Sequence, residues 1–275
     1  MASKRNEAED YLLGSRDEEL ARLGSQHRVW AETAFALWRR AGFRSGGRIL
    51  DLGCGPGFST VDLAHLVGSS GRVVAVDASR RFLDHLEAGA RALGLANIET
   101  VECDVRDLQL EPASLDGAYA RWLFCFLDDP AAAVGRVAAA LKPGAAFAVN
   151  DYFNYRAFTL APRSAALDRV VVAVERFWAA EGGDLEIQGR MPSLMRDHGL
   201  TVTDISTTSV VARPGSPHWS WPASFFQAFL PRLVQGGYVT AADSRAFWSD
   251  WERRSEDPAA FMFLPPMIDV IGVKD

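Results

Sequence analysis

The chain has 275 residues, of which 48% are hydrophobic and 23% charged, and its formal net charge is −6. The length fits one large α/β domain, and the composition is that of an ordinary globular protein. The negative charge, with no cluster of Lys and Arg, argues against nucleic acid or an anionic membrane as a partner. No stretch is apolar enough for a signal peptide or for the roughly 18 residues of a membrane span, so we expect a cytoplasmic protein.

The cysteines give a second constraint. Cys54, Cys103 and Cys125 are odd in number and lack the spacing of metal ligands. A reduced, intracellular setting with no bound metal is the simplest interpretation.

The N-terminal part, residues 1–43, is predicted to be helical. Apolar residues recur at helical spacing from Leu20 to Trp38, so one or two helices should pack on the core and form a lid. His27 lies on this apolar stripe, where we expect a packed histidine rather than a catalytic one.

Strands and helices alternate from residue 48 onward. Strands are predicted at 48–55, 71–79, 97–105, from 115, and at 145–153. Helices are predicted between them at 58–68, from Ser79 to Gly94, and from Asp128 and Pro130 to residue 144. The alternation indicates a parallel sheet with helices on both faces and right-handed crossovers.

The second half of the chain is less regular. Its pattern predicts helices at 164–181, 192–199, 222–235 and 240–254, and strands at 201–211 and 267–273. We expect segments 156–200 and 212–260 to cap the site and to select an acceptor. We interpret the aromatic stripe in the second segment primarily as a helix face that packs in the core. The secondary interpretation is a pocket wall, which would include Trp219 and Phe229.

The stretch ILDLGCGPGFST, residues 49–60, spaces Gly53, Gly55 and Gly57 two apart, directly after the first strand. Glycine allows sharp turns and a close approach of the backbone to a ligand. In a doubly wound sheet this loop lies at the carboxyl edge of the strands, where ligands bind. Asp77 ends the second strand, where an acid can bind both hydroxyls of a ribose.

Two cofactor classes fit such a loop. Dinucleotide enzymes use G-x-G-x-x-G, whereas this chain has G-x-G-x-G preceded by Asp51. An acid beside the loop suits an ammonium group better than a phosphate, and S-adenosylmethionine has an ammonium, a sulfonium, a ribose and no phosphate. Asp51 is alternatively a cap of the following helix. Asp104, at the end of the third strand, is placed to meet an adenine amine.

These segments resemble the class I S-adenosylmethionine-dependent methyltransferases. DLGCGPG, VVAVDAS and ECDVRDL match their first three motifs, and 115–153 looks like their fourth and fifth segments. The resemblance covers about 48–153, and residues 11–23 resemble an N-terminal lid. Quinone C-methylating relatives often have a His at the position of Cys125, so we assign no role to that residue.

The resemblance implies a Rossmann-like, doubly wound α/β fold with a seven-stranded sheet whose last strand is antiparallel. We expect one domain over 1–275, with a lid at 1–43, a cofactor-binding core at 44–155 and the two cap segments. The residues expected to bind the cofactor are Tyr11, Asp51, Gly53, Cys54, Gly55, Gly57, Asp77, Ala78, Asp104, Val105 and Arg121, the last through its backbone.

The expected function is methyl transfer from S-adenosylmethionine to a small, partly apolar or aromatic acceptor in secondary metabolism. The acceptor and the methylated atom, oxygen, nitrogen or carbon, stay open, as does the oligomeric state. Asp151 and His218 are the polar residues expected nearest the transferring methyl group. The alternatives are a nicotinamide-dependent oxidoreductase and an S-adenosylmethionine-binding protein that transfers no methyl group.

Overall fold

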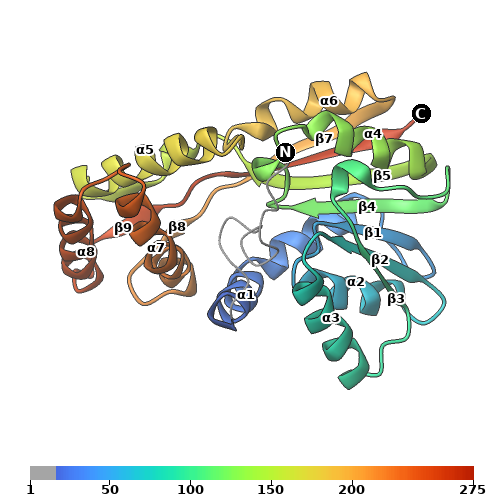
Figure 1. The fold of residues 1–275 in the computed structure, drawn as a ribbon, viewed down its shortest axis with the longest axis horizontal. Coiled ribbons are helices and arrows are strands. Elements are labelled where there is room, and N and C mark those ends of the chain that lie inside the picture. Colours follow the sequence, from blue (N-terminus) through green and yellow to red (C-terminus); the bar gives the residue numbers. More distant parts are fainter. Residues whose placement is uncertain (1–16) are drawn as a thin grey trace, which may run out of the picture.

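The computed structural model describes residues 17–275, and its centre is the predicted seven-stranded sheet (Figure 1). The strands lie side by side in the order β3 (Ile98–Glu102), β2 (Arg72–Asp77), β1 (Arg48–Leu52), β4 (Leu115–Arg121), β5 (Leu141–Tyr152), β10 (Met267–Lys274) and β7 (Leu200–Thr208). Strands β1 to β5 are parallel, and β10 is antiparallel to both of its neighbours. The expected sheet with an antiparallel last strand is confirmed.

The helices cover both faces of the sheet because the central strands are apolar on both sides. Ile49 and Val73 pack with α1 (Asp17–Arg40) and α2 (Phe58–Val67), and α3 (Arg80–Ala92) packs on the same side. Leu50 and Val74 face the opposite side. That side is covered by α4 (Pro130–Ala140) and α6 (Met191–Asp197).

The N-terminal ends of α3 and α4 show which of the predicted capping residues cap a helix. Ser79 caps α3 as expected, because its hydroxyl accepts a hydrogen bond from the Phe82 amide at 3.4 Å. Helix α4 is capped by Asp129, which accepts from the Ala132 amide at 3.1 Å, and not by Asp128. Asp128 instead pairs with Arg106. Asp128 and Asp129 are both of a residue type that caps helices. Because Asp128 pairs with Arg106, Asp129 is the acid that caps α4.

A second lobe lies at the other end of the molecule from β1–β3 (Figure 1). It contains α5 (Ala165–Ala180), α7 (Pro217–Gln235), α8 (Ala241–Ser255) and a small antiparallel sheet of β6 (Thr159–Ala161), β9 (Phe261–Phe263) and β8 (Val211–Ala212). The small sheet was not predicted, since strands of two or three residues have no readable alternation. Helix α7 begins earlier than expected because Ser216 caps it.

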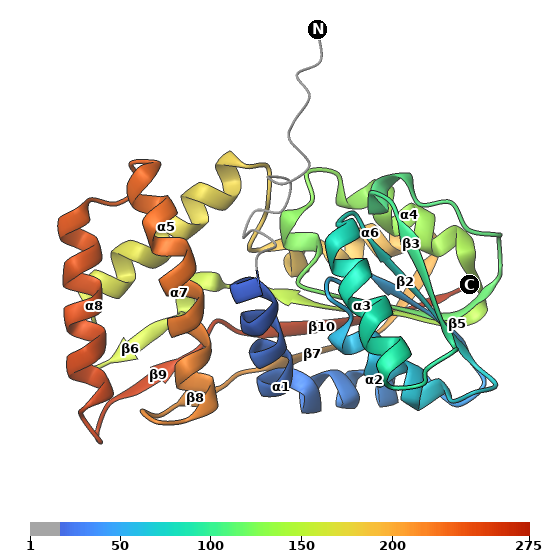
Figure 2. The same cartoon turned by 60° about the horizontal axis from the view of Figure 1, so that its bottom comes forward.

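Helix α1 lies between the two lobes (Figure 2). None of the helices in residues 17–275 combines the length and hydropathy needed to cross a bilayer.

The last turn of α1 is anchored to the sheet by Arg40. Its guanidinium donates to Asp269 of β10 at 2.5 Å and to Asp204 of β7 at 2.8 Å. Asp269 is 3% exposed and also accepts from the Asn150 side chain at 2.6 Å. Burial raises the pKa of Asp269, and Arg40 opposes that rise. Arg40 therefore holds α1 in place through Asp269, and the buried charge of Asp269 is stabilised by this cationic partner.

We expect Arg40→Met to lower the free energy of unfolding by roughly 1–3 kcal/mol, because it leaves the buried Asp269 with one partner fewer. The loss should be larger at pH 8 than at pH 5. A buried acid without its cation has a raised pKa in the fold, so its protonated form is the one that folding favours, and stability falls as the pH rises. Urea denaturation at both pH values measures this. Asp204→Asn, at the exposed end of the same network, is the control and should cost less than about 1 kcal/mol; equal losses at both positions would contradict the assignment.

Candidate active site

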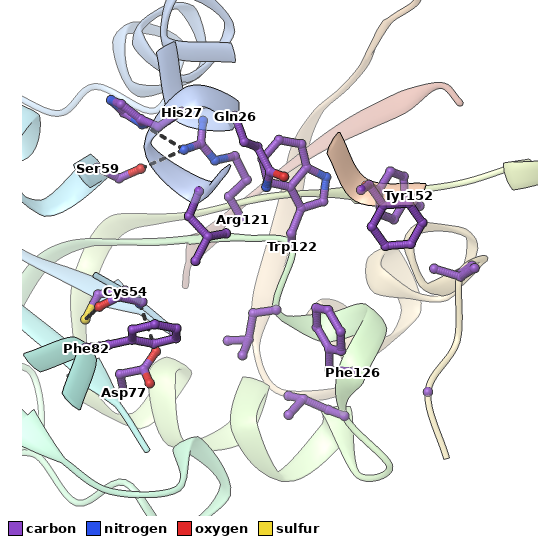
Figure 3. A pocket seen from close by; sticks show the side chains of 18 of the residues that line it. Gln26, His27, Cys54, Ser59, Asp77, Phe82, Arg121, Trp122, Phe126 and Tyr152 are labelled. Atoms are coloured by element: carbon purple, nitrogen blue, oxygen red, sulfur yellow. Dashed lines mark hydrogen bonds between the residues drawn. The ribbon is translucent and has the colours of Figure 1, made fainter. Parts of the chain in front are cut away.

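A cavity of about 690 Å³ opens at the carboxyl ends of β1, β2 and β4. The core strands, α1 and the helical lobe all contribute to its wall (Figure 3). Its size is typical of sites for small molecules and cofactors. The wall is polar where the core and α1 supply it and aromatic where β5 and the lobe supply it.

The glycine loop forms part of the polar wall, although only two of its three glycines reach it. Gly53 and Gly55 line the cavity with φ values of +67° and +54°. A Cβ at Gly55 would meet nothing within 4 Å, so its backbone is open to a ligand. Gly57 was expected to line the site, but it packs against α3, where a Cβ would lie 2.3 Å from Leu86. The glycine at position 57 is required by helix packing rather than by a ligand.

Asp77 ends β2 with its carboxylate held by two backbone amides. One oxygen accepts from the Gly55 amide at 2.8 Å, and the other accepts from the Ser79 amide at 2.9 Å. Burial raises the pKa of Asp77, and the two amides oppose that rise. Each oxygen keeps a free lone pair, and Asp77 and Ala78 both line the cavity, as expected. The loop and the acid thus hold each other in position.

Asp104 and Val105 also line the cavity, but Asp104 is already paired. Arg106 donates to one carboxylate oxygen at 2.9 Å and to the other at 2.5 Å. This fork lowers the pKa of Asp104. An adenine amine would have to share the carboxylate with Arg106, so the adenine role of Asp104 stays a prediction.

Asp51 is the acid nearest the base of the glycine loop and is 2% exposed. It accepts from the Thr60 hydroxyl at 2.6 Å, a side chain of α2, and no backbone amide of that helix caps onto it. Burial raises its pKa to about 6, the Thr60 hydroxyl and Arg121 oppose this, and Asp77 adds to it. Asp51 lines the cavity together with Cys54. Thr60 and Arg121 therefore compensate only part of the cost of burying the negative charge of Asp51.

The side chain of Arg121 points into the same region, whereas only its backbone was expected there. It donates to His27 at 3.0 Å and to Ser59 at 3.0 Å (Figure 3). His27 and Gln26 of α1 also line the cavity, so α1 supplies side chains to the site. Tyr119, two residues before Arg121 on β4, also lines the cavity, and its buried hydroxyl interacts with Ser59.

The structure does not bring Asp151 and His218 together at the cavity, and neither lines it. Asp151 is fully buried and accepts from the Cys125 amide at 3.1 Å and from the Tyr152 amide at 2.9 Å. Its carboxylate therefore fixes the turn after β4. His218 packs edge-on against Trp30, with ring centroids 5.5 Å apart. The geometry gives no support to this pair as the catalytic one. Tyr11 lies outside the described residues.

The aromatic wall uses different residues from those expected. Trp219 is 4% exposed and donates from its indole to Ser255 at 3.0 Å, and Phe229 is fully buried between the rings of α5. Trp221 and Phe225, one helical turn apart on α7, face the cavity instead. Phe229 lies on the same side of α7 as Trp221 and Phe225 and stacks on Phe225, with ring centroids 5.1 Å apart. The sequence did not show where along that side the pocket ends and the core begins. The other wall residues from β5 and the lobe include Tyr152, Tyr155, Phe158 and Trp178.

Known proteins resemble the chain in the region that builds the polar wall. Residues 49–144 match a family profile described as a methyltransferase domain. A 2-phytyl-1,4-naphtoquinone methyltransferase of Trichormus variabilis is 34% identical over 128 residues, which cover 46% of this chain and 55% of that protein. Methyltransferase GfsG of Streptomyces halstedii is 26% identical over 78% of this chain and 72% of that protein. The chain spans about half the length, or less, of the first curated relatives that it matches.

The fold extends the resemblance beyond the matched region. Geranyl diphosphate C-methyltransferase from Streptomyces coelicolor A3(2) has a TM-score of 0.59 at 16% identity, over 98% of this chain and 90% of that chain. A putative methyltransferase from Bacillus halodurans has a TM-score of 0.60 at 15% identity, over 87% of this chain. The fold is that of Rossmann-like methyltransferase structures. Residues 49–144, which run from β1 into β5, match the methyltransferase-domain profile.

The raised pKa of Asp51 leads to a stability prediction with a definite sign. Its pKa of about 6 in the fold, against the ordinary 3.8, means that folding favours the protonated acid. Wild-type stability from this group falls as the pH rises from about 4 to 6 and stays low above that, by roughly 3 kcal/mol in all. Asp51→Asn should therefore be more stable than the wild type at pH 8 and similar to it at pH 4.

Chemical denaturation at the two pH values checks this. Asp84→Asn, an exposed acid on α3, is the control and should change little at either pH. A loss of stability in Asp51→Asn at pH 8 would show that Thr60 and Arg121 outweigh the cost of burial.

Proposed function

We propose that this protein binds S-adenosylmethionine along the polar wall and transfers its methyl group to a small, apolar acceptor held against the aromatic wall. The observation that carries the proposal is the pair of buried carboxylates, Asp51 and Asp77, on either side of the open backbone of Gly55. A ligand with an ammonium group at one end and a ribose at the other matches both. A phosphate-bearing dinucleotide could place a ribose at Asp77 but would bring its pyrophosphate against the negative charge of Asp51.

The residues present fit this cofactor at several points. Asp77 would accept from the ribose hydroxyls with the lone pairs that the Gly55 and Ser79 amides leave free. Asp51 would pair with the ammonium, which returns its pKa toward the ordinary range. Arg121 would pair with the carboxylate of the same amino-acid end. Ala78, Phe82 and Val105 supply apolar contacts for a flat base.

When bound, the cofactor supplies an electrophilic methyl group on a positively charged sulfur. The chain contributes alignment and a water-poor pocket. Such alignment is worth the equivalent of roughly 10⁵–10⁸ M in effective concentration. General-base help is typically about 10²–10⁴-fold. Glu181 is the one carboxylate in the part of the wall supplied by β5 and the lobe, and this range is smaller than the contribution of alignment, so alignment carries most of the rate in this proposal.

The aromatic wall supports a neutral acceptor. Among the residues that β5 and the lobe supply, Glu181 is the one charged side chain, and the rest are aromatic, aliphatic, Pro or Gly. Burial raises the pKa of Tyr152 and Tyr155, so both phenols stay neutral. A planar, apolar molecule gains from stacking there. A phosphate group would find no cation in this half of the wall.

Two other functions compete with methyl transfer. A nicotinamide-dependent oxidoreductase would use Asp77 for a ribose as well, but it needs a pyrophosphate beside the glycine loop, where Asp51 lies. A protein that binds the cofactor without transferring methyl would share the polar wall, and only a turnover assay separates it from a transferase.

Asp77→Ala should weaken binding of S-adenosylhomocysteine at least tenfold, because a charged acceptor of two hydrogen bonds, each worth roughly 1.5–3 kcal/mol, is lost. Isothermal titration calorimetry measures the affinity. Asp84→Ala on α3 is the control and should bind as the wild type does. Equal affinity in Asp77→Ala and wild type contradicts the ribose assignment, and tight binding of NADH by the wild type would overturn the proposed function.

Phe225→Ala and Phe229→Ala form a matched pair one turn apart on α7. Phe225→Ala should lower methyl transfer to neutral phenols and leave cofactor affinity within about threefold, because the ring faces the acceptor half. Phe229→Ala should instead cost roughly 3–5 kcal/mol of stability as a core truncation. Release of S-adenosylhomocysteine with a panel of neutral and phosphorylated phenols, together with thermal melting, tests both. Higher turnover with the phosphorylated members would refute the neutral acceptor.

A further inference from the structure

His27 is a residue of α1 that lines the polar wall and contacts Arg121, and the proposed function assigns it no role. Its Nε2 lies 2.8 Å from a carboxylate oxygen of Asp62 on α2, and its Nδ1 lies 3.0 Å from an Nη2 of Arg121 at the end of β4. The ring stacks on Phe58, with centroids 6.0 Å apart and planes inclined by 21°. Three contacts from two elements thus fix the position and the plane of the imidazole.

The partners also fix which nitrogen carries the proton. A guanidinium has N–H donors and no acceptor, so Nδ1 must be the acceptor of the bond from Arg121. Nε2 then carries the hydrogen and donates it to Asp62, which orients the ring. The imidazole is therefore neutral, and it presents a lone pair to Arg121.

Arg121 uses three of its five N–H donors on the protein and keeps two for a ligand. The bonds go to His27, to Ser59 and, at 3.5 Å, to the Trp30 carbonyl. These three acceptors lie on α1 and α2. Asp51 is the nearby carboxylate that attracts the same guanidinium. Without its neutral acceptors, Arg121 would be drawn to Asp51 and would neutralise the acid that the proposed ammonium site needs.

We infer that His27 is a positioning residue for the amino-acid end of the cofactor: through its unprotonated Nδ1 it holds the Arg121 guanidinium toward the ligand carboxylate and away from Asp51. This inference rests on the proposed function, because it assumes that an amino-acid group binds there. The inferred role also links the position of α1 to cofactor binding, because His27 is an α1 residue and both of its polar partners belong to the core.

Two ligands separate this role from a purely structural one. S-adenosylhomocysteine carries the amino-acid end, whereas 5′-methylthioadenosine has the adenine, the ribose and the sulfur without it. In His27→Phe the ring can still stack on Phe58, but both hydrogen bonds are lost. We expect its affinity for S-adenosylhomocysteine to fall about tenfold or more, and its affinity for 5′-methylthioadenosine to stay within about twofold of the wild type.

His27→Asn serves as the rescue variant. An Asn side-chain oxygen takes a position similar to that of Nδ1 and accepts from Arg121, so this variant should recover most of the affinity for S-adenosylhomocysteine. Proton–nitrogen correlation spectra of the wild-type imidazole should show the hydrogen on Nε2 and not on Nδ1. Calorimetry with both ligands on the three proteins completes the test.

The outcomes separate the inference from the function it rests on. If the wild type binds neither ligand, the proposed function fails. If the wild type binds both and His27→Phe weakens both equally, His27 only holds α1 in place, and the inference is wrong. It is also wrong if His27→Phe binds both as tightly as the wild type, or if the hydrogen resides on Nδ1.

Discussion

The site depends on the burial of two carboxylates at the ends of neighbouring parallel strands. Asp51 is the next-to-last residue of β1 and is buried, and Asp77 is the last residue of β2 and is half-buried at the cavity wall. Backbone amides and a hydroxyl compensate part of the cost of burial. Arg121 is the nearby cation that lowers the pKa of Asp51. A buried acid that the protein leaves under-compensated is typical of a functional site, because a cationic ligand can complete the compensation.

The helices outside the core turn this strand edge into an enclosed cavity. Arg40 fixes the end of α1 to β7 and β10, and the earlier turns of α1 then reach the polar wall through His27 and Gln26. The Gln26 side chain accepts from the Trp221 indole at 3.0 Å, which joins α1 to the helical lobe. One helix therefore contacts both the proposed cofactor half and the proposed acceptor half. Its displacement would open both halves together.

Much of the core was predictable because its signals are local. The glycine loop with Asp51, and Asp77 at the end of β2, lie within about 30 residues of one another, and each strand or helix of the alternation is recognised from its own short window. Ser79 as a cap, and Gly53 and Gly55 as loop residues, follow from the same short range. Asp151 and His218 were misplaced for the opposite reason. The sequence put them near the strand edge, but whether a side chain points into the cavity or into the core depends on packing partners far along the chain.

The sequence by itself determined the parallel strands and the acids at their edge, since periodicity and glycine spacing are properties of neighbouring residues. The antiparallel last strand followed from the resemblance of the sequence motifs to those of the methyltransferase family. Only the tertiary structure decided which aromatic residues of α7 form the pocket wall, because Trp221, Phe225 and Phe229 share one side of the helix and packing partners decide which of them are covered. It also decided that Gly57 serves helix packing, that Arg106 occupies Asp104, and that His27 meets Arg121 from 94 residues away. These choices rest on contacts between distant segments, and such contacts leave no mark on local sequence patterns.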